Sequence, residues 1–293
     1  MSVQNLTKEI WPNFFIVGAP KAGTTSLYAY LNKIPDIYMS PVKEPAYFSR
    51  LEGHSKTYRD KEKYLSLFTK VKNQKIIGES TPSYLMQPLT PKLIHEVSPN
   101  ARILISLRDP VERIFSHFLM QTRFRIPQFS FHDKLQLELK GKNSSGTNMG
   151  LHYGLYSESV KRYLDIFGNE QVKIVIFEEF IKNPKNTVQE ILRFLDLNFE
   201  LENFKGEVYN PFRTPRGPLS HYLLTNLNVK KLAEKLITSS GRTYLSEHFL
   251  LQKSSKPKMN QNDKDALIKF YSDDVKKLEQ LLGRQLHWAN FFF

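Results

Sequence analysis

The stretch FFIVGAPKAGTTSL, residues 14–27, decides the fold because it joins three local patterns. It opens with four apolar residues, which predict a buried strand over 14–18. A loop with two glycines and a lysine follows, and TTSLYAYLNKI predicts a helix over 24–34. A strand, a glycine-rich turn and a helix N-terminus form an anion site, because free backbone N–H groups and the helix dipole point at the ligand.

The rest of the chain alternates between apolar runs and helical patterns. This alternation predicts an α/β fold with a largely parallel central sheet. We expect a single domain over residues 1–293, with irregular structure around 210–218 and a flexible loop over 141–150. The remaining predicted strands are 75–79, 101–109 and 172–180, and the remaining predicted helices are 110–124, 154–168 and 183–197.

The composition narrows the classes of function. The 293 residues carry a formal charge of +13, which suggests an anionic partner such as a nucleotide, a polyanion, a nucleic acid or a membrane surface. The chain has no cysteine, which excludes disulfides, thiolate chemistry and Cys-ligated zinc. No signal sequence and no window of ~20 apolar residues is found, so we expect a cytoplasmic protein without a membrane span.

The loop after the first strand differs from that of a nucleoside triphosphatase. Gly18 and Gly23 have the G-x-x-x-x-G spacing of a Walker loop, but Thr24 stands where the phosphate-binding lysine is needed. The only lysine in the loop is Lys21, before the second glycine. The segment PKAGTT at 20–25 instead resembles the 5′-phosphosulfate loop of sulfotransferases, whose donor is 3′-phosphoadenosine 5′-phosphosulfate (PAPS).

A second motif lies in LISLRDPVERIFSHF, residues 104–118. Arg108 leaves a predicted strand and Ser116 lies about two helical turns further on, so both can meet one phosphate. The pattern resembles the 3′-phosphate site of sulfotransferases, R-[DN]-P-x-[ED]-R-x-x-S, and Arg113 matches its second arginine. Two further segments, VKEPAYF at 42–48 and GESTPSYL at 78–85, resemble motifs of bacterial and heparan-type members.

The resemblance covers most of residues 12–200 and, less tightly, 210–289. It implies a P-loop-like, three-layer domain whose core is followed by a helical C-terminal part over 210–293. It also implies sulfuryl transfer from PAPS to an acceptor hydroxyl, with adenosine 3′,5′-bisphosphate (PAP) as product and no metal required. A glycan or polysaccharide is the favoured acceptor, and a lipid, a polyketide or a small aromatic alcohol is left open.

The resemblance also assigns roles to residues. It implies that Lys21 stabilises the leaving phosphate, that Glu79 is the base, and that Lys43 contacts the sulfuryl group or simply pairs with Glu44. His117 is a rival base, and Glu79 is alternatively an anchor for the helix start at Thr81. The residues implied in nucleotide binding are Lys21, Ala22, Gly23, Thr24, Thr25, Ser26, Arg108 and Ser116, with Arg216 and Gly217 as a weaker match.

Two other classes of function stay open on sequence grounds. A P-loop small-molecule kinase lacks the Walker lysine, and Asp109 is the nearest candidate for its metal-binding aspartate. A basic nucleic-acid-binding protein would use the lysines and Arg242 of the C-terminal part, but no nucleic-acid motif accompanies them. We therefore expect a nucleotide donor and no nucleic-acid partner.

Overall fold

The computed structural model describes residues 9–50, 58–122, 129–142, 149–201, 204, 206, 213–238, 241 and 245–292. The chain forms two compact units. The first comprises Met1–Arg113, His152–Tyr209 and Ile268–Phe293, and the second comprises Ile114–Leu151 and Asn210–Leu267. The single domain predicted over residues 1–293 stays a prediction. Among the described residues, no helix is long and apolar enough to cross a membrane.

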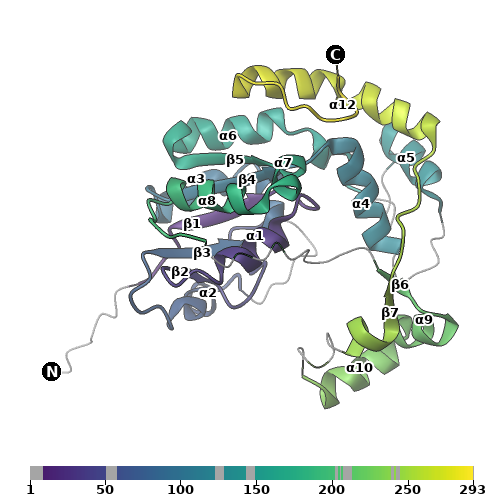
Figure 1. The fold of residues 1–293 in the computed structure, drawn as a ribbon, viewed down its shortest axis with the longest axis horizontal. Helices are drawn as coiled ribbons and strands as arrows, with labels where there is room; N and C mark the ends of the chain where they lie inside the picture. The colour runs from purple at the N-terminus through teal and green to yellow at the C-terminus, as the bar shows by residue number, and fades with distance from the viewer. Residues whose placement is uncertain are drawn as a thin grey trace. The chain divides into compact units, whose positions relative to one another are not determined.

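The first unit is built on a five-stranded sheet in which all neighbouring strands are parallel (Figure 1). The strand order is β2-β3-β1-β4-β5, which places the strand from the opening motif at the centre. Every residue of that central strand is buried, as its unbroken apolar sequence predicts. The strands are β1 (Phe14–Gly18), β2 (Ile37–Met39), β3 (Ile76–Ser80), β4 (Arg102–Leu107) and β5 (Val172–Ile176).

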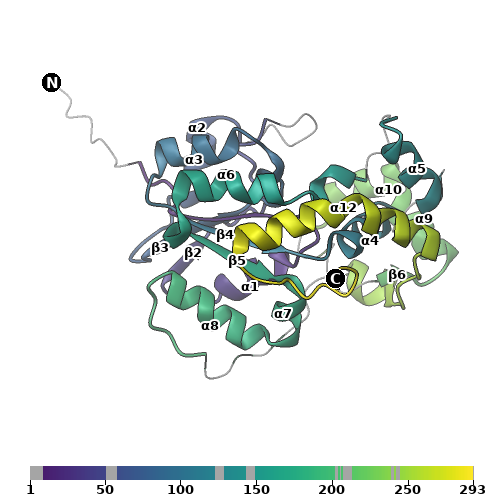
Figure 2. The same cartoon turned by 90° about the horizontal axis from the view of Figure 1, so that it is seen from above.

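Helices cover both faces of this sheet, as Figure 2 shows. One face carries α1 (Thr24–Leu31), α7 (Phe177–Lys182) and α8 (Pro184–Phe194), and the other carries α3 (Thr90–Val97) and α6 (Ser157–Phe167). On the first face, Leu27 and Leu31 of α1 pack with Ile191 of α8 in one buried apolar cluster. The predicted three-layer α/β fold with a mainly parallel sheet is therefore confirmed.

The remaining elements of the first unit are short. They are α2 (Lys61–Leu65), η1 (Ser66–Phe68), η2 (Pro82–Met86) and η4 (Asn169–Gln171), with η3 (Leu151–Gly154) at its boundary. Helix α4 (Pro110–Thr122) begins in the first unit and continues into the second, and α12 (Gln261–Leu282) runs from the second into the first. Asp274 of α12 accepts hydrogen bonds from the backbone N–H of Tyr156 (2.6 Å) and the hydroxyl of Ser157 (2.5 Å), so it caps the start of α6.

The second unit contains only the first part of the predicted helical C-terminal part, Asn210–Leu267, because Ile268–Phe293 belong to the first unit. Its helices are α5 (Phe131–Leu139), α9 (Pro218–Thr225), α10 (Leu227–Leu236) and the π-helical turn η5 (Ser246–Leu250). Two short antiparallel strands, β6 (Arg213–Pro215) and β7 (Leu251–Lys253), pair within it. The irregular structure predicted around 210–218 is therefore wrong for β6, while 143–148 of the predicted flexible loop lie outside the described residues.

The strand predicted over 172–180 is half wrong. It ends at Ile176, and residues from Phe177 onward form α7. The apolar run continues through Phe177, which is why the sequence pattern does not show the boundary. Glu178 lies in the first turn of the helix and accepts hydrogen bonds from the N–H of Asp109 (3.2 Å) and the indole N–H of Trp288 (3.0 Å). These tertiary contacts favour a helix at this position.

Candidate active site

The loop between β1 and α1 presents backbone donors at the carboxyl edge of the sheet. Gly23 precedes the helix with φ +80°, and no acidic side chain lies in the first turn of α1. Within the described part of the chain, the N–H groups of Gly23, Thr24 and Thr25 have no acceptor. Free N–H groups at a helix N-terminus bind anions, so the predicted phosphate loop has the required backbone geometry.

Gly23→Ala is expected to be strongly destabilising. A Cβ at this position would lie 2.9 Å from Cδ2 of Phe177, in a left-handed conformation that already disfavours a side chain. We expect a loss of about 1–2 kcal/mol from the backbone conformation and about 1–3 kcal/mol from overpacking. Gly283→Ala is the control, since Gly283 also has positive φ but no atom within 4 Å of the added Cβ. Equal losses in denaturant unfolding would contradict this account of Gly23.

Side chains at the carboxyl end of β4 hold the loop in place. The hydroxyl of Ser106 donates to the carbonyl of Ala22 (2.5 Å), and Nη1 of Arg108 donates to the carbonyl of Lys21 (3.1 Å). The N–H of Ala19 donates to the carbonyl of Ser106 (2.5 Å). The two sequence motifs therefore lie side by side, although Arg108 and Lys21 are far apart in the chain.

Arg108 is a buried cation with an unused donor. The residue is 7% exposed, and its guanidinium lies 4.7 Å from the centroid of the Phe177 ring. Nη2 lies 3.7 Å from Oε2 of Glu112, whereas the buried Nε has no hydrogen-bond partner within the described residues. Burial lowers the pKa of Arg108, while Glu112 and Glu178 oppose this shift. A buried, unpaired guanidinium N–H indicates a place for an anionic ligand.

Asp109 has a structural role. Its Oδ1 accepts hydrogen bonds from the N–H groups of Val111 (2.9 Å) and Glu112 (3.4 Å), so it caps the start of α4. Its Oδ2 accepts from the side-chain amide of Asn290 (2.7 Å), which fixes the C-terminal segment. Burial raises its pKa. Because both oxygens are engaged, the structure gives no support to Asp109 as the metal ligand of a kinase.

Glu79 lies at the end of β3, fully buried. Its Oε1 accepts a hydrogen bond from the hydroxyl of Tyr64 (3.1 Å), and its Oε2 accepts one from Thr81 (3.3 Å). Burial raises the pKa of Glu79 to about 7, and hydrogen bonds from Tyr84, Tyr64 and Thr81 oppose that rise. A carboxyl with a pKa near neutrality has the proton affinity that suits a general base. The same bond to Thr81 is also compatible with an anchoring role.

The segment with Lys43 is bound to the segment with Glu79. The N–H of Glu44 donates to the carbonyl of Ser80 (3.0 Å), and the N–H of Phe48 donates to the hydroxyl of Tyr84 (3.1 Å). Nζ of Lys43 lies 2.5 Å from Oε1 of Glu44, which is the pairing considered from the sequence. These contacts hold the two motifs together at the same edge of the sheet, while contact of Lys43 with a sulfuryl group stays a prediction.

The other predicted site residues belong to the second unit. Ser116 and His117 are partly buried on α4, beyond the point where the units divide. The guanidinium of Arg216 donates to the carbonyls of Leu251 (3.1 Å) and His248 (2.8 Å), so it stabilises the β6–β7 region. Gly217 precedes α9 in an extended conformation. The predicted roles of these four residues in binding or catalysis stay predictions.

Sequence reasoning missed several side chains of this site. Tyr64 comes from α2 and lies outside the recognised motifs. Ser106 lies in β4, two residues before Arg108, and its residue type alone does not indicate a role. The sequence pattern predicts a strand at Phe177, whereas the structure places its ring against both Arg108 and Gly23. Tyr84 lies within GESTPSYL, so the motif contained it without indicating its contact with Glu79.

The comparisons with known proteins identify the family. Residues 12–211 match the sulfotransferase domain, and the chain therefore belongs to the sulfotransferase family. The sulfotransferase from Alicyclobacillus acidocaldarius has a similar structure, with a TM-score of 0.69, 30% identity, and coverage of 94% of this chain and 97% of that one. The family inferred from the motifs is confirmed.

Curated relatives are longer than this chain. Carbohydrate sulfotransferase 15 of Rattus norvegicus is 28% identical over 245 residues, which cover 64% of this chain and 44% of the relative. The bifunctional heparan sulfate N-deacetylase/N-sulfotransferase 1 of Caenorhabditis elegans is 25% identical, with coverage of 96% of this chain and 30% of the relative. The chain thus spans less than half the length of these relatives.

Proposed function

We propose that this chain transfers the sulfuryl group of PAPS to a hydroxyl group of a glycan. The observation that carries the proposal is the contact between the two predicted phosphate sites: Arg108 donates to the carbonyl of Lys21 and keeps a buried, unpaired Nε. Free N–H groups of Gly23, Thr24 and Thr25 lie in the same loop. These donors fit a nucleotide with separate phosphate groups.

The loop would hold the donor at its 5′ end. The N–H groups of Gly23 to Thr25 and the hydroxyls of Thr24, Thr25 and Ser26 would bind the 5′-phosphosulfate, and Arg108 would bind the 3′-phosphate. PAPS supplies an activated sulfuryl group when bound. Lys21 would stabilise the negative charge that develops on the leaving phosphate, the kind of charge stabilisation that contributes strongly to catalysis.

The acceptor hydroxyl must lose its proton as the new bond forms. Glu79 is the proposed base, because burial raises its pKa to about 7, where the ionised form is available at neutral pH and still binds a proton well. Its carboxylate has no exposed surface in this structure, so acceptor binding must part the side chains that cover it. His117 is the rival base.

The glycan acceptor is proposed from the relatives. Their printed names describe carbohydrate and heparan sulfate sulfotransferases. The formal charge of +13 is consistent with an anionic polysaccharide as well as with the nucleotide. No pattern in the described residues selects one sugar or one hydroxyl position.

A transfer assay tests the proposed function. The protein is incubated with PAPS and a panel of desulfated glycans, with a simple phenol as a second class of acceptor, and both PAP release and product mass are measured. We expect PAP release that depends on a glycan, with product heavier by one sulfuryl group. Transfer to the phenol alone would contradict the acceptor class, and no transfer together with magnesium-dependent ATP consumption would contradict the reaction.

A further inference from the structure

The carboxylate of Glu79 is held by hydroxyl groups from separate elements. Tyr64 of α2 donates to Oε1 at 3.1 Å, and Thr81, which follows β3, donates to Oε2 at 3.3 Å. Tyr84 of η2 is also fully buried, and its hydroxyl opposes the rise in the pKa of Glu79. Of these, Tyr64 comes from an element outside every recognised motif.

The hydroxyl of Tyr64 is not needed for the packing of its ring. Its ring stacks on Tyr47 with centroids 4.3 Å apart and an angle of 12°, and it makes edge contacts with Phe68 (5.4 Å) and Phe48 (5.8 Å). A phenylalanine would make the same ring contacts. The bond to Glu79 is the one hydrogen bond found for the hydroxyl among the described residues, and a buried hydroxyl is costly unless it is bonded.

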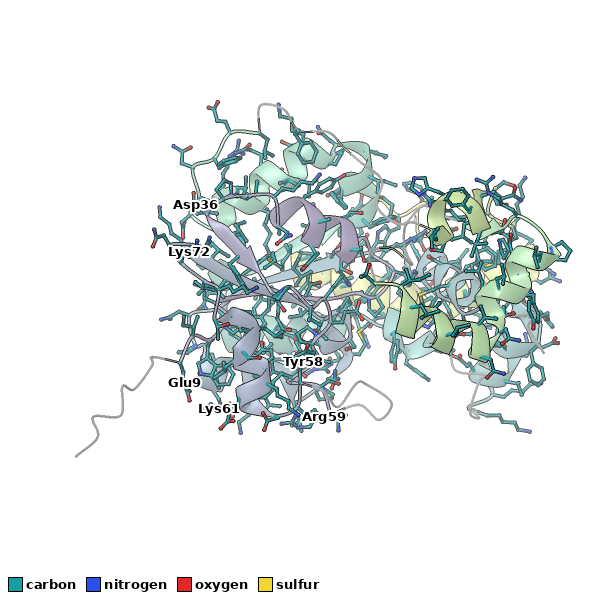
Figure 3. All side chains as sticks on the ribbon, turned by 90° about the horizontal axis from the view of Figure 1, so that it is seen from below. Glu9, Asp36, Tyr58, Arg59, Lys61 and Lys72 are labelled. Atoms are coloured by element: carbon teal, nitrogen blue, oxygen red, sulfur yellow. The ribbon has the colours of Figure 1, made fainter. Side chains whose placement is uncertain are left out.

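Helix α2 is fixed independently of Glu79. The Asp60 side chain caps it by accepting from the N–H of Lys63 (2.9 Å), and Lys61 pairs with Glu9 (2.6 Å) at the surface, where Figure 3 labels both residues. The hydroxyl of Tyr38 donates to the carbonyl of Leu67 (2.8 Å) in the adjoining η1. The position of the Tyr64 ring is therefore set by these contacts and by its aromatic neighbours, before the bond to Glu79 is considered.

The groups that face Glu79 are neutral hydroxyls. They are Tyr64 from α2, Thr81 after β3 and Tyr84 from η2, and Tyr163 from α6 is close enough for its pKa to be raised by the charge of Glu79. The nearby Lys43 pairs with Glu44 on the turn that is bonded to Ser80. Among the described residues, the influences on the pKa of Glu79 are burial and these hydroxyl bonds, with no cation among them.

We propose that Tyr64 is a positioning residue for Glu79, whose hydroxyl holds Oε1 in one orientation and stabilises the ionised carboxylate that accepts the acceptor's proton. The inference rests on the proposed function, which assigns Glu79 as the base. Tyr64 acts through its hydrogen bond to Glu79.

Loss of the hydroxyl has a directional consequence. Burial raises the pKa of Glu79 to about 7 and the Tyr64 bond opposes that rise, so Tyr64→Phe raises the pKa further. Activity that requires ionised Glu79 then begins at higher pH. We expect the acidic limb of the pH profile of kcat to move up by about one pH unit, with several-fold lower kcat at pH 7 and recovery in alkaline buffer. The KM for PAPS should not change.

The test compares two tyrosine-to-phenylalanine variants of the whole chain. Tyr64→Phe removes the hydroxyl that contacts Glu79, and Tyr38→Phe removes a hydroxyl that binds η1 without touching Glu79. The pKa of Glu79 is measured directly by carbon NMR of glutamate-labelled protein, with Glu79→Gln to assign the signal. We expect an upward shift only in Tyr64→Phe. A pKa equal in all three proteins overturns the inference.

A further variant has the opposite expected sign. Site-specific 3-fluorotyrosine at position 64 keeps the ring and makes the hydroxyl a stronger donor, so it should lower the pKa of Glu79. An unchanged or raised pKa overturns the inference, including in the case where Tyr64→Phe does not fold.

The NMR titration does not depend on turnover. A wild type that neither binds PAP nor transfers sulfuryl groups therefore contradicts the proposed function, while an active enzyme with an unshifted pKa in both variants contradicts only the role of Tyr64.

Discussion

Arg108→Ala is expected to reduce the affinity for PAP at least 100-fold. The residue is 7% exposed, and its guanidinium donates to the carbonyl of Lys21 while its Nε stays free for a ligand. Truncating one member of a buried, hydrogen-bonded charge pair costs about 2–5 kcal/mol, and about 2.7 kcal/mol corresponds to 100-fold in Kd. Calorimetric titration with PAP measures the loss directly.

Arg102→Ala provides the matched control for this variant. Arg102 is the first residue of β4, whereas Arg108 comes directly after the last. At its own end of the strand, the guanidinium of Arg102 donates to the carbonyl of Glu170 and the carboxylate of Asp196. We expect PAP affinity to stay near that of the wild type. Equal losses in both variants would mean that removal of an arginine from this strand acts through stability or overall charge, and would contradict a phosphate-binding role for Arg108.

Glu79→Gln is expected to lower kcat by about 10²–10⁴-fold, the usual contribution of general acid–base catalysis. The amide keeps the shape of the side chain but does not accept the acceptor's proton. PAP affinity should stay unchanged, because the proposed phosphate contacts come from the loop and Arg108. In the wild type, kcat should rise with pH through about 7, where the buried carboxyl ionises. Full activity of Glu79→Gln would leave His117 as the base.

The same variant has a predicted effect on stability, of opposite sign to its effect on activity. Burial raises the pKa of Glu79 from its ordinary 4.5 to about 7, so the folded state favours the protonated form. Its contribution is therefore most favourable below pH 4.5 and is lost as the pH rises through 7. The full difference corresponds to roughly 3 kcal/mol.

Glu79→Gln should accordingly be more stable than the wild type at pH 8, and the advantage should shrink toward pH 5. Denaturant unfolding at both pH values measures this difference. Glu96→Gln is the control, because Glu96 is exposed on α3 and should change neither kcat nor the pH dependence of stability. A constant difference between Glu79→Gln and the wild type at all pH values would contradict the raised pKa.

The parts of the fold that follow from local pattern could be predicted from the sequence. Phe14 to Gly18 form an apolar run with no polar face, which is typical of a central parallel strand. Pro110 begins α4 after the Asp109 cap, as the sequence indicates. The short strand Ile37–Met39 gives no comparable signal, because a strand of three residues is too short to show a period.

The residues of the candidate site also fall into two groups, those that the sequence indicates and those that only the structure shows. Lys21, Glu79 and Arg108 occupy motif positions that the sequence displays, and the structure adds the bond between Arg108 and the loop. Tyr64 and Phe177 act through tertiary contacts with residues that are distant in the chain. A sequence pattern records the residue types of such partners but not their contacts, so these two were found only in the structure.

Titration of the wild-type protein with PAP in the presence of EDTA tests the central claim most directly. The free N–H groups of the loop and the buried Nε of Arg108 predict saturable binding at one site, unaffected by removal of divalent metal. Magnesium-ATP should bind much more weakly, because Thr24 replaces the Walker lysine. No heat of binding with PAP, together with tight binding of magnesium-ATP, would contradict the account and favour a P-loop small-molecule kinase instead.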